Sequence, residues 1–131
     1  MKRILIAAAV LAAFALSAIA QDDWYRQRED RYRGEDWHPH IFMHVKMDLD
    51  HVWSAVHAAE KEQRRIERTK QELVQLQEDL DHDRWDNGTV NDVIDSLRKS
   101  SNDERLAPRD RDVLADDVVR IKAFQDEHNR R

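Results

Sequence analysis

Glycine and proline are scarce in this chain of 131 residues, which contains only Gly34, Pro39, Gly88 and Pro108. Folds that are rich in strands need many turn residues, whereas helical folds need few. No stretch alternates apolar and polar residues for long, as a half-buried strand would. The sequence therefore predicts an all-α fold.

A long helix is predicted from His40 to His82, because neither glycine nor proline interrupts this stretch. Its apolar residues recur at spacings of three, four and seven, which places them on one face of a helix. The turn signal Asp86-Asn87-Gly88 follows and predicts the connection to the next helix. The apolar seam consists of Val45, Leu49, Val52, Val56, Ala59, Ile66, Leu73, Leu76 and Leu80.

Two shorter helices are predicted after this turn. Thr89 and Asp92 resemble a capping box that opens the first of them, which ends at Ser100 to Asp103. Pro108 suits the first turn of the last helix, since its missing N–H group is not needed there. The expected fold is a small antiparallel bundle of one long helix and two shorter helices. The apolar faces of the two shorter helices comprise Val90, Val93, Ile94 and Leu97, and then Val113, Leu114, Val118, Ile121 and Phe124.

Residues 1–20 have the three-part pattern of a secretory signal peptide. Lys2 and Arg3 precede an apolar run that ends in Ser17-Ala18-Ile19-Ala20, which predicts cleavage after Ala20 and a periplasmic or secreted location. The alternative is an uncleaved anchor, but the run is shorter than the ~20 residues that a membrane span needs. Residues 21–39 are predicted to form a flexible arm rich in charged and aromatic residues. The alternative is that the aromatic side chains of this segment pack on the helical domain. Residues 40–131 are predicted to form the helical domain.

Charge and cysteine content exclude several classes of function. Loss of residues 1–20 removes Lys2 and Arg3 and reduces the 22 basic residues to 20 against 27 acidic ones, which gives a net charge of −7. An acidic chain is a poor ligand for nucleic acid or an anionic membrane. The chain contains no cysteine and therefore has no disulfide, thiol nucleophile or thiolate metal site.

A histidine flank is the clearest candidate for a metal site. His40, His44 and His51 lie within about 40° of one another on the predicted helix, and Asp48 lies between them. Imidazole and carboxylate groups at such spacings bind Zn²⁺, Ni²⁺ or Cu²⁺. His40 and His51 are about 16 Å apart along the axis, so one ion would need His40 and His44, or Asp48 and His51, completed by another helix or subunit. The alternative is that these are polar residues beside the core stripe.

Catalytic signatures are missing from the sequence, which contains no nucleophile elbow, zinc-protease motif, phosphate-binding loop or dinucleotide fingerprint. The stretch from Asp83 to Gly88 resembles part of an EF-hand loop. Trp85 and Ile94 then occupy positions that require oxygen ligands, so calcium binding is not predicted. We therefore expect a protein that is not an enzyme. A hydrolase with an unrecognised site is a further class of function, which we rank behind protein binding and metal binding.

The stretch from Leu106 to Leu114 resembles the L-T-P-x-Q-R-x-x-L segment that opens a helix in the Spy/CpxP-like periplasmic proteins. Leu106, Pro108, Arg111 and Leu114 match this segment, whereas Ala107 and Asp110 replace its threonine and glutamine. The resemblance implies a role in the extracytoplasmic stress response, through binding of unfolded proteins on a helical cradle or, in related members, binding of metal.

The leading expectation is an exported, non-enzymatic helical protein that binds other proteins or itself. Part of the long seam, from Val45 to Val56, is expected to remain uncovered by the two shorter helices and to drive this association. The alternative is a periplasmic protein that binds or senses a transition metal through His40, His44, Asp48 and His51. Nucleic acid and stable membrane insertion after cleavage are not expected.

Overall fold

The computed structural model describes residues 22–131, which belong to two compact units divided between Trp37 and His38. The predicted signal peptide, residues 1–20, lies outside the described residues. Among residues 22–131, no helix combines the length and the apolar character that crossing a membrane requires.

The first unit contains a helix over residues 22–31, within the segment predicted to be a flexible arm. A turn follows, in which the backbone N–H of Tyr32 bonds back to the carbonyl of Arg28. Gly34 has a φ of +67°, a conformation that glycine adopts without a steric penalty. The indole N–H of Trp37 donates to the carbonyl of Gly34 over 3.0 Å, and the rings of Tyr32 and Trp37 meet edge to face at 5.4 Å. The aromatic residues of this segment thus support one another.

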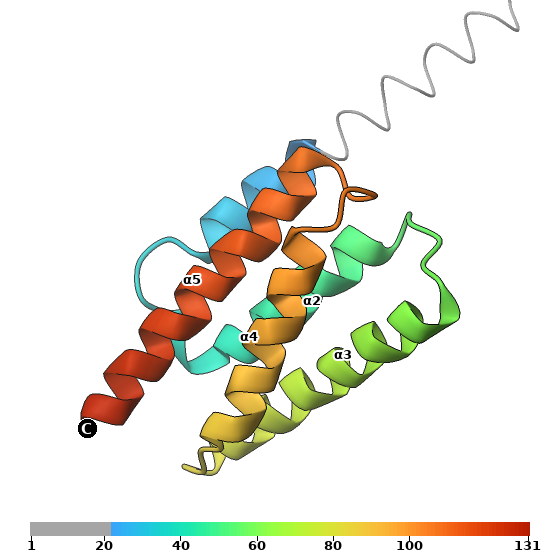
Figure 1. Cartoon of the computed structure of the whole chain (residues 1–131). Coiled ribbons are helices and arrows are strands. Elements are labelled where there is room, and N and C mark those ends of the chain that lie inside the picture. The colour runs from blue at the N-terminus through green and yellow to red at the C-terminus, as the bar shows by residue number, and fades with distance from the viewer. Residues whose placement is uncertain (1–21) are drawn as a thin grey trace, which may run out of the picture. The chain divides into compact units, whose positions relative to one another are not determined.

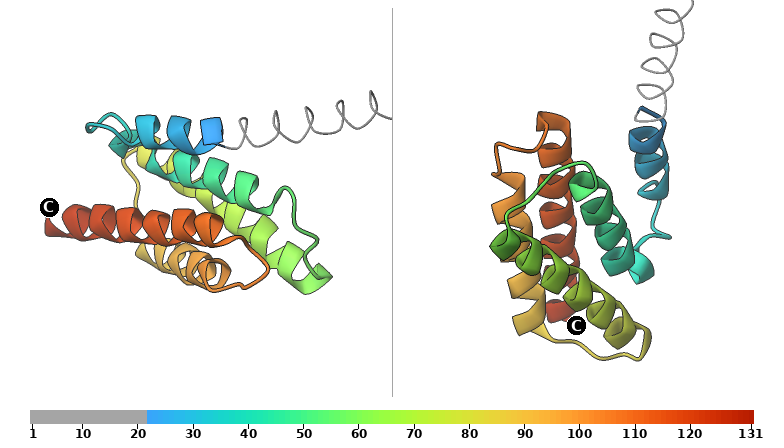
Figure 2. Two further views of the ribbon diagram at one scale, coloured as in Figure 1. Left: turned by 90° about the horizontal axis from the view of Figure 1, so that it is seen from above. Right: turned by 90° about the vertical axis from the view of Figure 1, so that its right-hand side faces the viewer.

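The second unit, His38–Arg131, consists of a short 3₁₀ turn and four α-helices (Figures 1 and 2). No strand occurs among residues 22–131, so the predicted all-α class is confirmed for the described chain. The predicted arrangement of one long and two shorter helices is wrong, because the long helix is divided in two. The elements are η1 (His38–His40), α2 (Ile41–Trp53), α3 (Glu60–Asp81), α4 (Asn87–Ser101) and α5 (Pro108–Arg130).

Each helix of this unit runs antiparallel to the next. Lys70 of α3 pairs with Asp50 of α2, and Thr69 of α3 bonds to Ser96 of α4. At the other end, Gln125 of α5 donates to Asn91 of α4. Helix α5 also packs on α2, which closes an up-and-down four-helix bundle in which α4 and α5 lie side by side (Figure 1).

The break between α2 and α3 spans residues 54–59, where the sequence contains neither glycine nor proline. The Ser54 hydroxyl donates to the carbonyl of His51 over 2.7 Å, and the Ser54 backbone N–H donates to the same oxygen. These bonds replace the next helical one and end α2. Ala59 is extended (φ −61°, ψ 153°) and is the N-cap residue before α3. Folding back is favourable because it buries both halves of a seam that one straight helix would leave partly exposed.

The core is built from the predicted apolar faces. Val45, Leu49 and Val52 are at most 2% exposed, so this part of the seam is buried and the expectation that it stays uncovered is wrong. Val56, in the connection, is only half-buried. The remaining core positions predicted from the sequence that the structure buries are Ile66, Leu73, Leu76, Val90, Val93, Ile94, Leu97, Val113, Leu114, Val118 and Ile121.

Helix α4 begins earlier than the capping-box prediction placed it. Asp86 is the N-cap, and its carboxylate accepts the Thr89 backbone N–H over 3.2 Å and the Thr89 hydroxyl over 2.9 Å. These bonds lower the pKa of Asp86 below its ordinary value of 3.8. Asn87 and Gly88 are therefore the first residues of the helix. Pro108 opens α5, as predicted.

Candidate functional site

The structure places the predicted histidine flank along α2. His40 is exposed and occupies the N-cap position, where its side chain makes no capping hydrogen bond. His44 and His51 are half-buried, whereas Asp48 is fully buried. Because α2 is helical from Ile41 to Trp53, one side of it carries His44, Asp48 and His51, as the spacing predicts.

In the part of the chain that the structure describes, no other element completes a metal site on this flank. Among residues 22–131, no three histidine, aspartate or glutamate side chains are grouped so that they could hold a metal ion together. The burial of Asp48 also removes its carboxylate from the solvent-facing side of the helix. A metal ion bound at His40, His44 or His51 therefore needs ligands from outside the described part of the chain.

A second candidate surface lies where α2 and α3 pack together. The backbone N–H of Met43 donates to Gln77 Oε1 over 3.3 Å, and Lys70 Nζ lies 2.9 Å from Asp50 Oδ1. These two contacts fix the antiparallel register of the helices. Met47 lies between the two contacts on α2, and Val74 lies between them on α3. The register therefore places Met47 and Val74 at the same level.

Three of these side chains are apolar and exposed: Met43 by 37%, Met47 by 48% and Val74 by 42%. We call them the methionine patch. Large exposed apolar side chains in the described residues are these three and Val119, which lies on α5. Most of the exposed large apolar side chains are thus gathered on one pair of helices.

Charged side chains border the methionine patch. Asp50 accepts from Lys46 Nζ over 2.9 Å and pairs with Lys70 over the same distance. Burial raises the pKa of Asp50, but the hydrogen bonds and charges of Lys46 and Lys70 outweigh it and hold that pKa below 3.8. For Lys70, burial lowers the pKa, but the carboxylates of Asp50 and Glu67 outweigh burial and hold that pKa above 10.5. An apolar centre with an ion-paired rim is the usual anatomy of a protein interface.

Local sequence patterns did not predict the methionine patch. At 100° per residue, Met43 and Met47 lie on the side of the helix opposite Val45, outside the apolar seam. The sequence signal for the patch was that these two methionines lie one helical turn apart (i,i+4) on the side away from the core. Val74 joins them only through the fold-back of α3, which local sequence patterns did not reveal.

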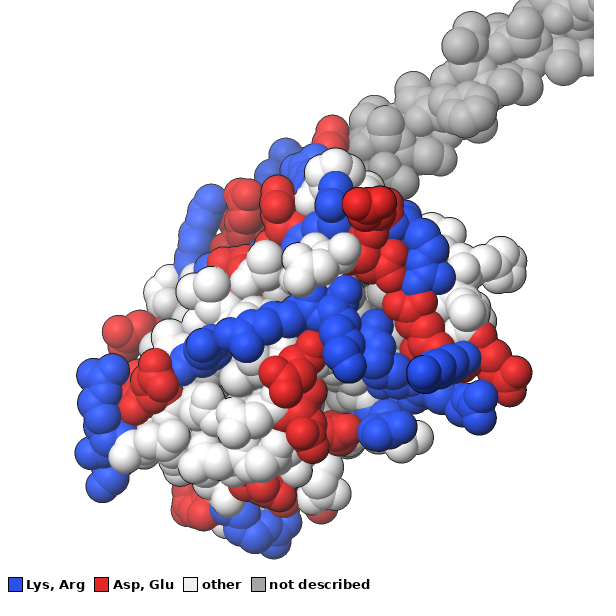
Figure 3. Space-filling view, in the orientation of Figure 1, with Lys and Arg blue, Asp and Glu red and all other residues white. Residues whose placement is uncertain are grey.

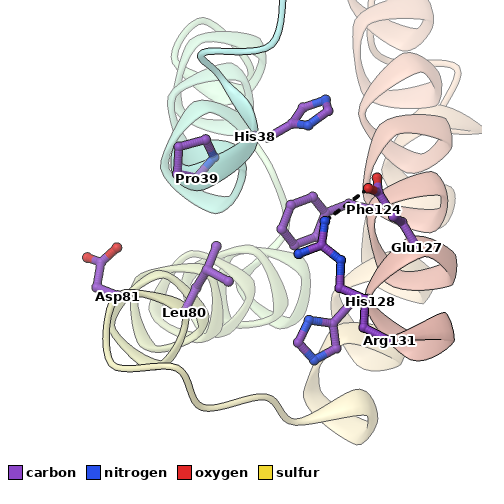
Figure 4. Close-up of a pocket in the computed structure, with 8 residues that line it drawn as sticks. All are labelled: His38, Pro39, Leu80, Asp81, Phe124, Glu127, His128 and Arg131. Atoms are coloured by element: carbon purple, nitrogen blue, oxygen red, sulfur yellow. Dashed lines mark hydrogen bonds and ion pairs between the residues drawn. The ribbon is translucent and has the colours of Figure 1, made fainter.

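A cavity of about 390 Å³ opens where η1, the end of α3 and the end of α5 meet (Figure 4). Its apolar wall is made by Pro39, Leu80 and Phe124. Titratable side chains surround this wall, and in Figure 4 Asp81 lies on the opposite side of the opening from Glu127 and Arg131. The titratable lining residues are His38, Asp81, Glu127, His128 and Arg131.

An aromatic cluster supports the cavity from behind. Trp85 stacks on His128, with ring centroids 4.0 Å apart and planes inclined by 20°. Phe124 meets Phe42 edge to face at 6.2 Å and lies 5.9 Å from Trp85. His38 adds a further edge-to-face contact with Phe124 at 6.3 Å. These rings come from four separate segments, so no local motif predicted the cluster.

Gln77 holds two of the residues that line the cavity, Pro39 and Asp81. Its side-chain nitrogen donates to the carbonyl of Pro39 over 2.7 Å and to Asp81 Oδ1 over 3.0 Å. Its side-chain oxygen accepts the Met43 backbone N–H. Gln77 is 6% exposed and thus joins η1, α2 and α3 with one buried amide.

A polar groove between α3 and α4 has a mainly structural explanation. Arg65 donates over 2.8 Å to both the carbonyl and the hydroxyl of Ser96, which ties the two helices together. Nearby, burial and the Asp92 carboxylate raise the pKa of Glu72 above 4.5, and Arg68 opposes this shift. The groove carries charges of both signs, so it does not select ligands of one charge.

On the face shown in Figure 3, basic and acidic side chains lie next to one another, with broad uncharged areas between the charged groups. Such mixing gives no extended positive field on this face. Comparisons with protein families, curated proteins and solved structures give no match to this chain. The methionine patch and the cavity are therefore the two features of the described residues that indicate a function.

Proposed function

We propose that this chain is an exported, non-enzymatic protein that binds other proteins, or a second copy of itself, through the methionine patch. The single observation that carries the proposal is the gathering of Met43, Met47 and Val74, all more than one-third exposed, on the α2–α3 pair. Exposed apolar side chains bordered by charges are typical of protein interaction sites.

Methionine suits a binder of varied partners. Its side chain is unbranched and has a polarizable sulfur, so it adjusts to differently shaped apolar surfaces. A role in the periplasmic stress response, as the resemblance of Leu106 to Leu114 implies, agrees with such adaptable binding. In the structure, Leu106 and Leu114 are buried and Pro108 opens α5, so these matching residues also serve the fold.

The proposal is tested with a double substitution, Met43→Glu and Met47→Glu. We expect it to abolish self-association in sedimentation velocity and suppression of aggregation of an unfolded test protein. Val119→Glu is the matched control, because Val119 is 65% exposed but lies on α5. Equal association and suppression by all three proteins would contradict the proposal, provided that far-UV circular dichroism shows the same helix content.

Binding of a transition metal is the alternative proposal, with His40, His44, Asp48 and His51 as ligands. The buried position of Asp48 and the need for outside ligands give it less support. Titration calorimetry with Zn²⁺ separates the two proposals. A site on this flank requires heat that His44→Ala removes and His128→Ala retains; absence of heat would eliminate it.

A further inference from the structure

The cavity at the end of the bundle is lined by an unequal set of charges. Asp81 and Glu127 each contribute a carboxylate, and Arg131 contributes one guanidinium. With His38 and His128 neutral, the lining has a formal charge of −1. The cavity is therefore a better environment for a positive than for a negative group.

The two carboxylates differ in their partners. Glu127 pairs with Arg131 over 3.1 Å, but the side chains of both are more than half exposed, so the pair is weak and easily exchanged. Asp81 accepts a hydrogen bond from the neutral amide of Gln77. Its charge is not cancelled by an ion pair with any residue in the range 22–131. Asp81 is thus the stronger attachment point for a cation.

The apolar wall adds a second requirement. Leu80 and Pro39 offer aliphatic surface, and Phe124 presents a ring that is itself packed in the aromatic cluster. The face of an aromatic ring attracts cations as well as apolar groups. A volume of about 390 Å³ lies in the range of small-molecule sites.

From these observations we infer that the cavity binds a small amphiphilic organic cation. Its ammonium group lies against Asp81, its apolar body lies on Leu80 and Phe124, and Glu127 and Arg131 face it from the opposite side of the opening (Figure 4). Arg131, held by Glu127, is an internal cation that competes with the ligand. This site shares no lining residue with the methionine patch.

Titration calorimetry of the full chain at neutral pH tests the inference with three probes of one size. Phenethylamine carries the charge, 2-phenylethanol has the same body without it, and phenylacetate has the opposite charge. We expect phenethylamine to bind most tightly. Asp81→Asn should lower the affinity for phenethylamine about fivefold, which is the effect expected for the loss of one exposed charge contact. Asp126→Asn removes a charge that does not line the cavity and should leave the affinity unchanged.

Arg131→Gln gives the sharpest test because the two signs of ligand predict opposite results. If the site takes cations, removal of the competing guanidinium strengthens the binding of phenethylamine. If it takes anions, the same change weakens phenylacetate. Equal affinity for all three probes, preference for phenylacetate, or a lower affinity of the Arg131→Gln variant for phenethylamine would each overturn the inference. All three substitutions, at Asp81, Asp126 and Arg131, are at exposed positions, and unchanged melting temperatures confirm that the fold is retained.

Discussion

The division of the apolar seam into two helices predicts a large difference between Leu49 and Val56. Both belong to the same seam in the sequence. In the structure Leu49 is 1% exposed in the core, whereas Val56 is half-buried in the connection between α2 and α3. Substitution of each by alanine therefore distinguishes two folded-back helices from one continuous helix.

Leu49→Ala removes a fully buried side chain and leaves a cavity, which costs about 2–5 kcal/mol in free energy of unfolding. For a domain of this size, a loss of about 3 kcal/mol lowers the melting temperature by roughly 12–24 °C. Val56→Ala removes two methyl groups that are already partly in water, so we expect a loss of about 1 kcal/mol or less.

Urea unfolding followed by far-UV circular dichroism measures both values, and an unchanged dependence on urea shows that the variants unfold in the same way. Leu73→Ala, at 0% exposure in α3, is a positive control and should cost as much as Leu49→Ala. Equal losses for Leu49→Ala and Val56→Ala would refute the break between α2 and α3.

Three further predictions concern a cap, an ion pair and export. Asp86→Ala should lower the melting temperature at neutral pH more than Asp86→Asn, since asparagine is also a good N-cap. Because the folded-state pKa of Asp86 is lowered, its stabilisation is present above pH 3.8 and is lost as the pH falls through the folded value, so the variant and the parent should converge in acid. Lys70→Met should cost less than about 1 kcal/mol by urea unfolding, because the Asp50 side chain is 42% exposed, and added salt should shrink the difference; a larger loss would contradict a weak, screened pair. N-terminal sequencing after expression in a bacterium should show cleavage after Ala20, and recovery of the intact chain in the membrane would contradict it.

The sequence was sufficient where local patterns decide the structure. Scarcity of glycine and proline predicted the helical class, and apolar spacing predicted the buried faces of α4 and α5. The start of α5 followed from Pro108. The end of α2 was not predictable in this way, because Ser54 and its neighbours carry no strong helix-breaking signal and the break is favoured by burial of distant residues.

The candidate sites depend on contacts between distant segments, and sequence patterns described them poorly. The histidine flank lies on one helix and was predicted as a set, but the burial of Asp48 depends on tertiary packing. Val74 reaches the methionine patch through the fold-back of α3. The cavity joins Asp81 to Glu127 across two helices, which no spacing in the chain encodes.

Selective ¹³C labelling of methionine methyl groups tests the proposed function most directly. The chain has three methionines, and Met43 and Met47 form two-thirds of the methionine patch, while Met1 lies in the segment predicted to be removed. Addition of a reduced and alkylated unfolded protein, or an increase in the concentration of the chain itself, should shift or broaden the methyl signals of Met43 and Met47. Unchanged signals from both residues, under conditions in which sedimentation shows a complex, would contradict binding through this patch.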